Sequence, residues 1–197
     1  MSASPLQVLA VVGSLNKNAV TRVVIDHVTH ALRKAGAEVD VLDFLKEPLA
    51  LFNPDSSHAA EGFDELRARV EQADAYVLGT PDYHGSISST MKNFLDHFWH
   101  EFAGKLFATV VASHEKGLTV TDQLRTVARQ CYAWSLPYGL SFTENVDVKE
   151  GRIASESFKE RLDMMVRDVR VYGALIAQQR RTDLSTADAC FLARYRK

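Results

Sequence analysis

The stretch VVGSLNKNAVTR, residues 11–22, joins the end of an apolar run to the first turn of a helix through a polar turn. The apolar run, residues 6–12, is short, nearly continuous and rich in valine, which is typical of a parallel strand covered on both faces. After the turn, valine and alanine recur at intervals of three and four as far as Ala35, which predicts an amphipathic helix that stops at Gly36. A strand, a polar turn and a helix together form the opening unit of an α/β fold.

The same alternation continues along the chain. Short apolar runs predict further strands at residues 39–42, 75–79, 106–112 and 136–142, and apolar stripes predict helices at residues 63–73, 91–102, 120–131 and 158–176. Five strands interleaved with five helices predict a three-layer α/β sandwich around a five-stranded parallel sheet, for which the order 2-1-3-4-5 is favoured. In this order the ligand crevice lies beyond the carboxyl ends of strands 1 and 3, so functional residues are expected after Val12, Gly79 and Ala112.

Composition and charge limit the classes of function. The chain has 197 residues, of which 46% are hydrophobic and 24% charged, so we expect residues 1–197 to form one ordinary globular domain. The formal net charge of −2 gives no attraction to nucleic acid or to a membrane surface, which leaves small molecules and other subunits as expected partners. No basic region precedes the N-terminal apolar run, and Cys131 and Cys190 are expected to be reduced; both features favour a cytoplasmic protein.

Three segments fall outside the alternation. Residues 46–62 form a long connection, and residues 144–153 predict a short hairpin around Glu150 and Gly151. Residues 182–197 predict either a short C-terminal helix or a loose arm. Because this tail carries Phe191 and Leu192, we expect it to dock, with another subunit as one option for the docking surface.

The first polar loop has the chemistry of a phosphate site. The backbone N–H groups and the dipole at the start of a helix favour an anion. Six side chains that follow Gly13 add hydrogen-bond donors, namely those of Ser14, Asn16, Lys17, Asn18, Thr21 and Arg22. The loop is neither a dinucleotide fingerprint, because it lacks the further glycines, nor a P-loop, because Gly-Lys-Ser/Thr is absent. A plain helix cap made of polar residues is the alternative.

The second polar loop, GTPDYHGSISSTMKNFLDHF at residues 79–98, follows the third predicted strand. Pro81 and Gly85 are expected to bracket a rigid turn whose backbone amides, from Asp82 to Ser86, face the edge of a flat heteroaromatic ligand, while Tyr83 supplies an aromatic wall. His84 is a candidate proton donor because histidine is the residue type that changes charge near neutral pH, and a loop histidine that only hydrogen-bonds is the alternative. An ordinary Pro/Gly turn is the alternative for the whole loop.

Together the two loops resemble those of the NAD(P)H-dependent FMN reductase family, a flavodoxin-like group of FMN, quinone, azo and chromate reductases. The family's phosphate loop, GSxRxxSxxR, is matched by Gly13, Ser14 and Arg22. Its flavin loop, TPEYNGSxPxxLKNxxD, is matched by Thr80, Pro81, Tyr83, Gly85, Ser86, Lys92, Asn93 and Asp96, with Asp82 in place of glutamate. The segment FAGKLFATVVASHEKG is similar to the family's fourth strand and third loop, which adds Ser113 and Gly117 to the implied cofactor site.

The resemblance implies an FMN-dependent oxidoreductase. The FMN phosphate is expected at residues 14–22 and the flavin ring at residues 81–86. NADPH or NADH is expected to deliver a hydride to the flavin, which then passes it to an acceptor such as free flavin, a quinone or an azo compound. The resemblance further implies a homodimer or homotetramer, and the aromatic residues Phe98, Trp99 and Phe102 are expected either at that interface or in the core.

Two other functions stay open. A flavodoxin-like electron carrier has the same fold, although such carriers are usually strongly acidic and have a phosphate loop rich in threonine and serine, which this sequence lacks. Alternatively, the chain has lost tight FMN binding and holds another ligand, because Asn16 and Ala19 stand where the family has arginine and serine. His84 and Ser88 also depart from the family's asparagine and proline. No metal site is expected, since the pair His97 and His100 lacks a distant third ligand.

Overall fold

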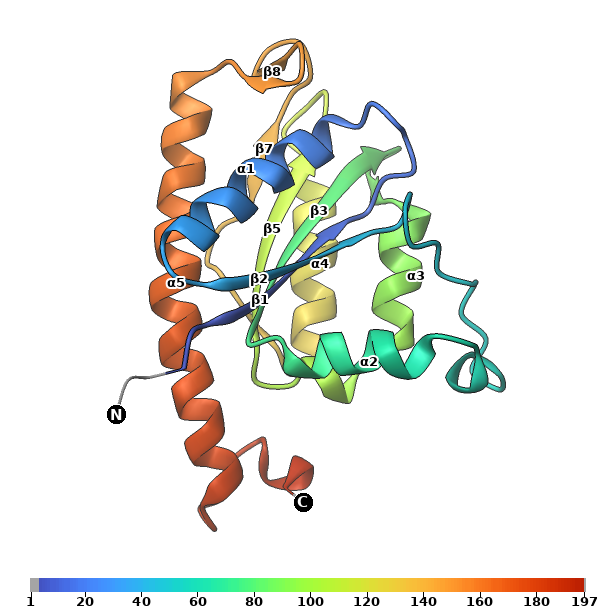
Figure 1. The fold of residues 1–197 in the computed structure, drawn as a ribbon, viewed down its shortest axis with the longest axis vertical. Coiled ribbons are helices and arrows are strands. Elements are labelled where there is room, and N and C mark those ends of the chain that lie inside the picture. Colours follow the sequence, from blue (N-terminus) through green and yellow to red (C-terminus); the bar gives the residue numbers. More distant parts are fainter. Residues whose placement is uncertain (1–3, 197) are drawn as a thin grey trace.

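The computed structural model describes residues 4–196, which form a central sheet with helices on both faces (Figure 1). The strands of the sheet are β1 (Gln7–Val12), β2 (Glu38–Asp43), β3 (Ala75–Tyr83), β4 (Ser86–Ile87), β5 (Leu106–Ala112), β6 (Trp134–Ser135) and β7 (Leu140–Phe142). The parallel strands run in the order β2-β1-β3-β5, and β6 and β7 pair with successive parts of β5. Since β6 and β7 share the fifth position, the predicted order 2-1-3-4-5 is confirmed.

The helices form two layers. They are α1 (Val20–Lys34), α2 (Phe63–Gln72), α3 (Ser89–His97), α4 (Leu118–Gln130) and α5 (Glu156–Ser185). In β1, Val8 and Ala10 pack with α1 and α5, whereas Leu9 and Val11 pack with α2, α3 and α4, because successive side chains of a strand point to opposite faces. Figure 1 shows α1 in front of the sheet and α4 behind it. Within residues 4–196, no helix is both long and apolar enough to cross a membrane.

The third strand is longer than the sequence predicted. It runs to Tyr83 instead of ending near Gly79, and its last residues pair with β4 in an antiparallel hairpin. The sequence did not predict this extension because a strand was predicted from an apolar run, and the polar residues Thr80 and Asp82 interrupt that run. Consequently, residues 80–87 of the predicted second loop form the end of a strand and a hairpin built on the sheet.

The predicted fifth strand is divided and the predicted third helix ends early. Pro137 lies between β6 and β7, where its missing N–H prevents a continuous ladder with β5. The helix α3 ends at His97 because Phe98 has extended backbone angles, and the short 3₁₀ turn η2 (His100–Phe102) follows. The apolar spacing continues through this break since Phe98 and Phe102 are both buried in the core, so of the predicted aromatic interface only Trp99 is exposed.

The C-terminal segment docks on its own chain. The helix α5 extends to Ser185, past the point where the sequence placed the start of the tail, and the tail ends with the 3₁₀ turn η3 (Ala193–Tyr195). Leu192 is buried and lies close to Gly104, whose φ is +73°. Two further short elements are η1 (Ser57–Ala59) and the predicted hairpin, which is confirmed as β8 (Val148–Lys149) and β9 (Arg152–Ile153).

Candidate functional site

Gly13 joins the carboxyl ends of β1 and β3. Its N–H donates to the carbonyl oxygen of Gly79 at 2.8 Å, and its own carbonyl oxygen accepts hydrogen bonds from the hydroxyls of Ser88, at 2.5 Å, and Thr90, at 3.0 Å. A Cβ atom at position 13 would lie 3.0 Å from the Gly79 oxygen and 3.0 Å from Met91 Cβ. Only glycine fits this close approach, so the start of the first loop is fixed against the sheet and against α3.

The first loop leaves several backbone donors without a partner. Ser14 Oγ accepts from the N–H of Asn16 at 3.3 Å, and Asn16 Oδ1 accepts from the N–H of Asn18 at 2.9 Å. The N–H groups of Ser14, Leu15 and Lys17, in contrast, have no acceptor within residues 4–196. The N-cap of α1 is Ala19, which has no side-chain oxygen that could cap the helix. The loop therefore presents free N–H groups at the positive end of a helix dipole.

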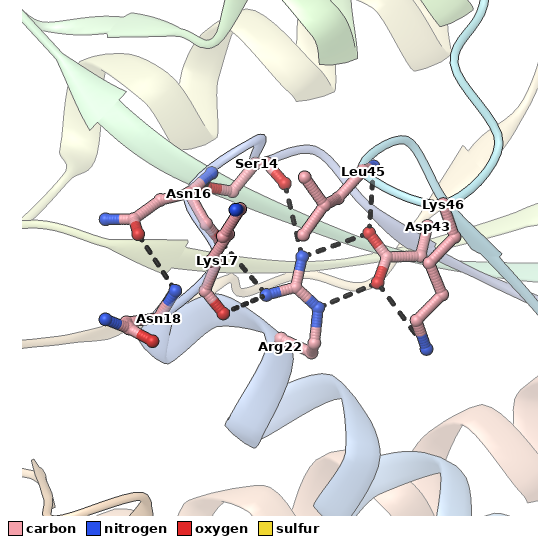
Figure 2. A network of polar contacts seen from close by, with 8 residues as sticks. All are labelled: Ser14, Asn16, Lys17, Asn18, Arg22, Asp43, Leu45 and Lys46. Atoms are coloured by element: carbon pink, nitrogen blue, oxygen red, sulfur yellow. Dashed lines mark hydrogen bonds and ion pairs between the residues drawn. The ribbon is translucent and has the colours of Figure 1, made fainter.

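Arg22 is fully used inside the protein (Figure 2). Its Nε and Nη2 donate to the two carboxylate oxygens of Asp43 at 2.7 and 3.1 Å. The carbonyl oxygens of Asn16, Lys17 and Ser14 accept from Nη1 and Nη2 at 3.0, 3.2 and 3.5 Å. These contacts occupy all five N–H donors of the guanidinium group. In this structure Arg22 therefore holds the loop in shape and has no donor left for a ligand.

Asp43, the last residue of β2, is the partner that sequence reasoning missed. It is 3% exposed, and it also accepts a hydrogen bond from the N–H of Leu45. Burial alone would raise the pKa of Asp43, but the hydrogen bonds from Arg22 and Leu45 outweigh it and hold the pKa below its usual value. An aspartate at the end of an apolar strand carries no signal that identifies its partner across the sheet.

The second loop is a tight β-hairpin. Tyr83 of β3 faces Ser86 of β4, and the two residues between them have positive φ angles, 56° at His84 and 75° at Gly85. Such a pair is typical of the type I′ turn, which matches the twist of a hairpin. The Asp82 carboxylate closes the turn by accepting from the N–H of Gly85 at 2.8 Å. Tyr83 is 53% exposed, so its ring is available as a wall.

A glutamine of α4 holds the hairpin from the side. Gln123 Oε1 accepts from the Ser86 hydroxyl and from the N–H of Ile87, both at 3.1 Å, and Nε2 donates to the carbonyl oxygen of Gly85 at 3.4 Å. This residue was not anticipated, because a polar residue on a helix gives no sign of what it faces. The other side of the hairpin is tied to the third loop, since the Ser113 hydroxyl donates to Asp82 Oδ2 at 2.9 Å.

The three loops enclose two adjoining cavities. The first, of about 140 Å³, lies between the first loop and the hairpin, and the second, of about 880 Å³, lies between the hairpin and the third loop. Both are lined by Asp82, Ser113 and His114, so they form one cleft. Of the other sequence-predicted residues, the first cavity is lined by Ser14, Asn16, Thr21, Pro81 and Tyr83, and the second by His84, Gly85 and Gly117.

Four predicted residues line neither cavity, namely Gly13, Lys17, Arg22 and Ser86. Gly13, Arg22 and Ser86 instead form contacts that support the loops, as described above. Lys17 is exposed and forms no ion pair within residues 4–196. Two residues that sequence reasoning missed, His114 and Glu144, line the first cavity. The cleft thus has a donor-rich end at the start of α1 and an aromatic end at the hairpin.

Comparison with known proteins assigns the family. A sequence profile of the family described as NADPH-dependent FMN reductase matches residues 6–146, which include both loops and the third loop. The NADPH-dependent FMN reductase ArsH of Shigella flexneri is 25% identical over 187 residues, which cover 90% of this chain and 72% of that protein. The FMN-dependent NADPH-azoreductase of Staphylococcus aureus strain USA300 is 30% identical over 137 residues, which cover 66% of this chain and 72% of that protein.

Solved structures show the same fold. The flavoenzyme NAD(P)H:(acceptor) oxidoreductase FerB of Paracoccus denitrificans superposes with a TM-score of 0.69 at 18% identity, covering 88% of this chain and 98% of that one. The predicted flavodoxin-like fold and the FMN- and NAD(P)H-dependent oxidoreductase that the loops indicated are thus confirmed at the level of the family. The chain belongs to the NADPH-dependent FMN reductase family.

Proposed function

We propose that the cleft binds FMN with its phosphate in the first loop and its flavin ring against the hairpin. The observation that carries the proposal is the position of the free N–H groups of Ser14, Leu15 and Lys17. They lie at an uncapped helix start, and the cleft at this point continues to the exposed ring of Tyr83. A ligand that carries both an anionic group and an aromatic ring matches the donor-rich end and the aromatic end of the cleft.

At the phosphate end, the donors are backbone N–H groups and small polar side chains. Ser14 and Thr21 supply hydroxyls, Asn16 supplies an amide, and Lys17 supplies a mobile positive charge. Arg22 acts indirectly, because its guanidinium group binds three carbonyl oxygens of the loop. The backbone N–H groups of the loop then point away from Arg22. Gly13 acts in the same way by fixing the start of the loop.

At the ring end, the chain positions the flavin and its partners. Bound FMN supplies the hydride-accepting and hydride-donating chemistry, and NADPH or NADH supplies the hydride. Backbone amides of the hairpin from Asp82 to Ser86, apart from that of Gly85, which donates to Asp82 Oδ1, are proposed to stabilise negative charge on the reduced ring. Ser113 and Gly117 border the second cavity, and His84 at its edge is proposed to donate a proton from its imidazole ring to an acceptor.

The second cavity is the proposed site of the acceptor. It is open, has a volume of about 880 Å³ and contains no buried acidic group, which suits a flat, uncharged molecule such as a quinone, a free flavin or an azo compound. The azoreductase among the relatives supports the azo compound in particular.

We further propose one domain over residues 1–197 that assembles as a homodimer or homotetramer at the mouth of the cleft. Four apolar side chains on the surrounding loops are 53–66% exposed, namely those of Leu15, Tyr83, Leu118 and Val146. A second copy placed over the cleft would bury them. The tail is less suited to this interface because it packs on its own chain through Leu192. Cys131 and Cys190 are both free thiols, which supports a cytoplasmic location.

One observation favours a variant of this function. Since Arg22 has no free donor, and since Asn16 and Ala19 replace the family's arginine and serine, the loop offers no guanidinium to the phosphate. A charge-assisted hydrogen bond contributes about 1.5–3 kcal/mol, so its absence weakens binding by roughly ten- to a hundredfold. FMN is then an exchangeable ligand, present only when supplied.

Titration with FMN followed by reduction tests the proposal. We expect quenching of FMN fluorescence with saturation in the micromolar range, anaerobic bleaching of the complex by NADPH or NADH, and recovery of the colour on addition of a quinone or an azo dye. Absence of quenching at high micromolar FMN contradicts FMN binding. A yellow complex that neither nicotinamide bleaches would instead identify an electron carrier.

A further inference from the structure

A second polar cavity lies at the end of the sheet opposite the cleft, where α5 and the tail meet the start of β5 (Figure 1). Its volume is about 530 Å³. The residues that matter here are His100 of η2, Lys105 just before β5, Arg180 of α5, and Tyr195 and Arg196 of the tail. None of them has a part in the proposed oxidoreductase function.

Lys105 and Arg180 line this cavity together with the acids Glu71 and Glu101, but neither cation forms an ion pair within residues 4–196. Arg180 is half-buried, and its Nε donates to the carbonyl oxygen of Ala103 at 2.9 Å, but its two terminal nitrogens have no acceptor within residues 4–196. Lys105 is 2% exposed, and its Nζ donates to the carbonyl oxygens of Val70, at 2.8 Å, and Glu71, at 2.7 Å. Burial, followed by the charge of Arg180, lowers the pKa of Lys105 to about 7.

The nearby carboxylates are engaged by other arginines. Glu101 forms an ion pair with Arg67 at 3.1 Å, and Glu71 lies 3.9 Å from the same guanidinium. Asp74 pairs with Arg181 at 3.3 Å. Positive charge at the cavity therefore exceeds negative charge, although buried charges in proteins are normally paired.

The tail contributes a hydroxyl that also lacks a partner. Tyr195 Oη is buried and has no hydrogen-bond partner within residues 4–196, whereas buried polar atoms are almost always bonded. Arg196 donates through Nε to the carbonyl oxygen of Asp183 and through Nη2 to that of Asp188 and to Cys190 Sγ, whereas Nη1 has no acceptor within residues 4–196. From α5 and from the tail the cavity thus receives N–H and O–H donors, while the carboxylates of Glu71 and Glu101 that also line it lie against Arg67.

We infer that this cavity binds the phosphate group of a small ligand. Arg180, with both terminal nitrogens, and Arg196, with Nη1, line one cavity, and guanidinium groups recognise phosphate oxygens through such N–H donors. A bound phosphate would also supply an acceptor to Tyr195 Oη and offset the charge of Arg180 and Lys105. Because η3 forms one wall, occupancy would hold the tail against the body of the protein.

Phosphate binding to variants of Arg180 tests the inference. All samples contain saturating FMN so that the first loop is occupied, and inorganic phosphate is compared with chloride at equal ionic strength. We expect phosphate to raise the melting temperature of the wild-type protein beyond the effect of chloride, with one binding event by calorimetry. R180M should lower the phosphate affinity at least about tenfold. R170M, which removes an exposed charge from the same helix, should leave it unchanged.

The variant Y195F keeps the inference testable if R180M folds poorly. Without phosphate it should melt at or above the wild-type temperature, because the hydroxyl that it removes has no partner within residues 4–196. With phosphate it should bind several-fold more weakly. Equal effects of phosphate and chloride on the wild-type protein would overturn the inference, and so would equal phosphate affinities of R180M and R170M. Neither result depends on the variant's oxidoreductase activity.

Discussion

The two loops that border the cleft are held in place by different forces. The first loop is held by a buried ion pair, Arg22 with Asp43, whose guanidinium also reaches three loop carbonyls. The hairpin is held by strand pairing, by a two-residue turn and by neutral hydrogen bonds from Gln123. Loss of one partner of a buried ion pair leaves an unpaired charge, whereas loss of one neutral hydrogen bond is milder. We therefore expect the first loop to be the fragile side of the cleft.

The largest effect is expected from R22M. The variant leaves the buried Asp43 carboxylate with only the Leu45 N–H and the exposed Lys46 ammonium, 4.0 Å away, so the free energy of unfolding should fall by about 3 kcal/mol, and FMN affinity should fall as the loop loses its shape. Urea denaturation and FMN titration measure the two effects. In the double variant R22M/D43L stability should recover while FMN affinity stays low. If the free energy of unfolding of R22M falls by less than about 1 kcal/mol, the first loop is not the fragile side of the cleft.

The same pair predicts a pH dependence. The pKa of Asp43 is lowered from 3.8 in the folded protein, so its contribution is fully present above about pH 4 and is lost as the pH falls through the folded-state pKa. The stability difference between the wild-type protein and R22M should therefore shrink below pH 4. Urea denaturation of both proteins between pH 3 and pH 7 measures it, and a difference that is constant over this range would speak against the ion pair.

An intermediate effect is expected from S88A, which affects the junction of the two loops. Ser88 is 2% exposed, donates to the carbonyl oxygen of Gly13 and caps α3 by accepting from the N–H of Met91. Loss of both contacts should lower the free energy of unfolding by about 2 kcal/mol. The matched control is S89A at the exposed neighbouring serine, which should change stability little. Equal losses in the two variants would show that Ser88 does not couple the loops.

A smaller effect is expected from Q123L on the hairpin side. The variant removes neutral hydrogen bonds to Ser86, Ile87 and Gly85, so stability should fall by about 1 kcal/mol. Because the hairpin is proposed to contact the ring, binding of riboflavin, which lacks the phosphate, should weaken together with binding of FMN. Q130L, at the exposed end of the same helix, is the control. If only Q130L weakens flavin binding, the role of Gln123 is refuted.

The smallest effect is expected from H84N and has the opposite sign. His84 has a φ of 56°, a conformation that asparagine adopts more readily, so the variant should gain roughly 0.5 kcal/mol in stability. If His84 also donates a proton, the H84N variant should reduce a quinone more slowly, although it is more stable. The pH profile of that rate should also flatten. Stopped-flow reduction of a quinone at several pH values separates these two roles.

Sequence reasoning found the parts of the cleft that depend on local pattern. Continuous apolar strands placed the first and third loops at neighbouring strand ends, and Pro81 with Gly85 marked the hairpin. It missed Asp43 and Gln123, because their partners lie 21 and at least 36 residues away and neither a strand-end aspartate nor a helical glutamine shows in the sequence what it faces. It also assigned Arg22 to the ligand, since a residue type alone does not reveal which of its donors the protein itself uses.

The division of the fifth strand limits which further strands can pair with that edge of the sheet. At this edge β6 and β7 contribute only two and three residues on either side of Pro137, too little to template a further strand. At the other edge, Arg33 and Arg69 donate to the outward carbonyl oxygens of Val39 and Val41 in β2. Both borders of the sheet are thus closed to strand addition. The proposed association of copies would therefore use helices and loops, and edge-to-edge aggregation is disfavoured.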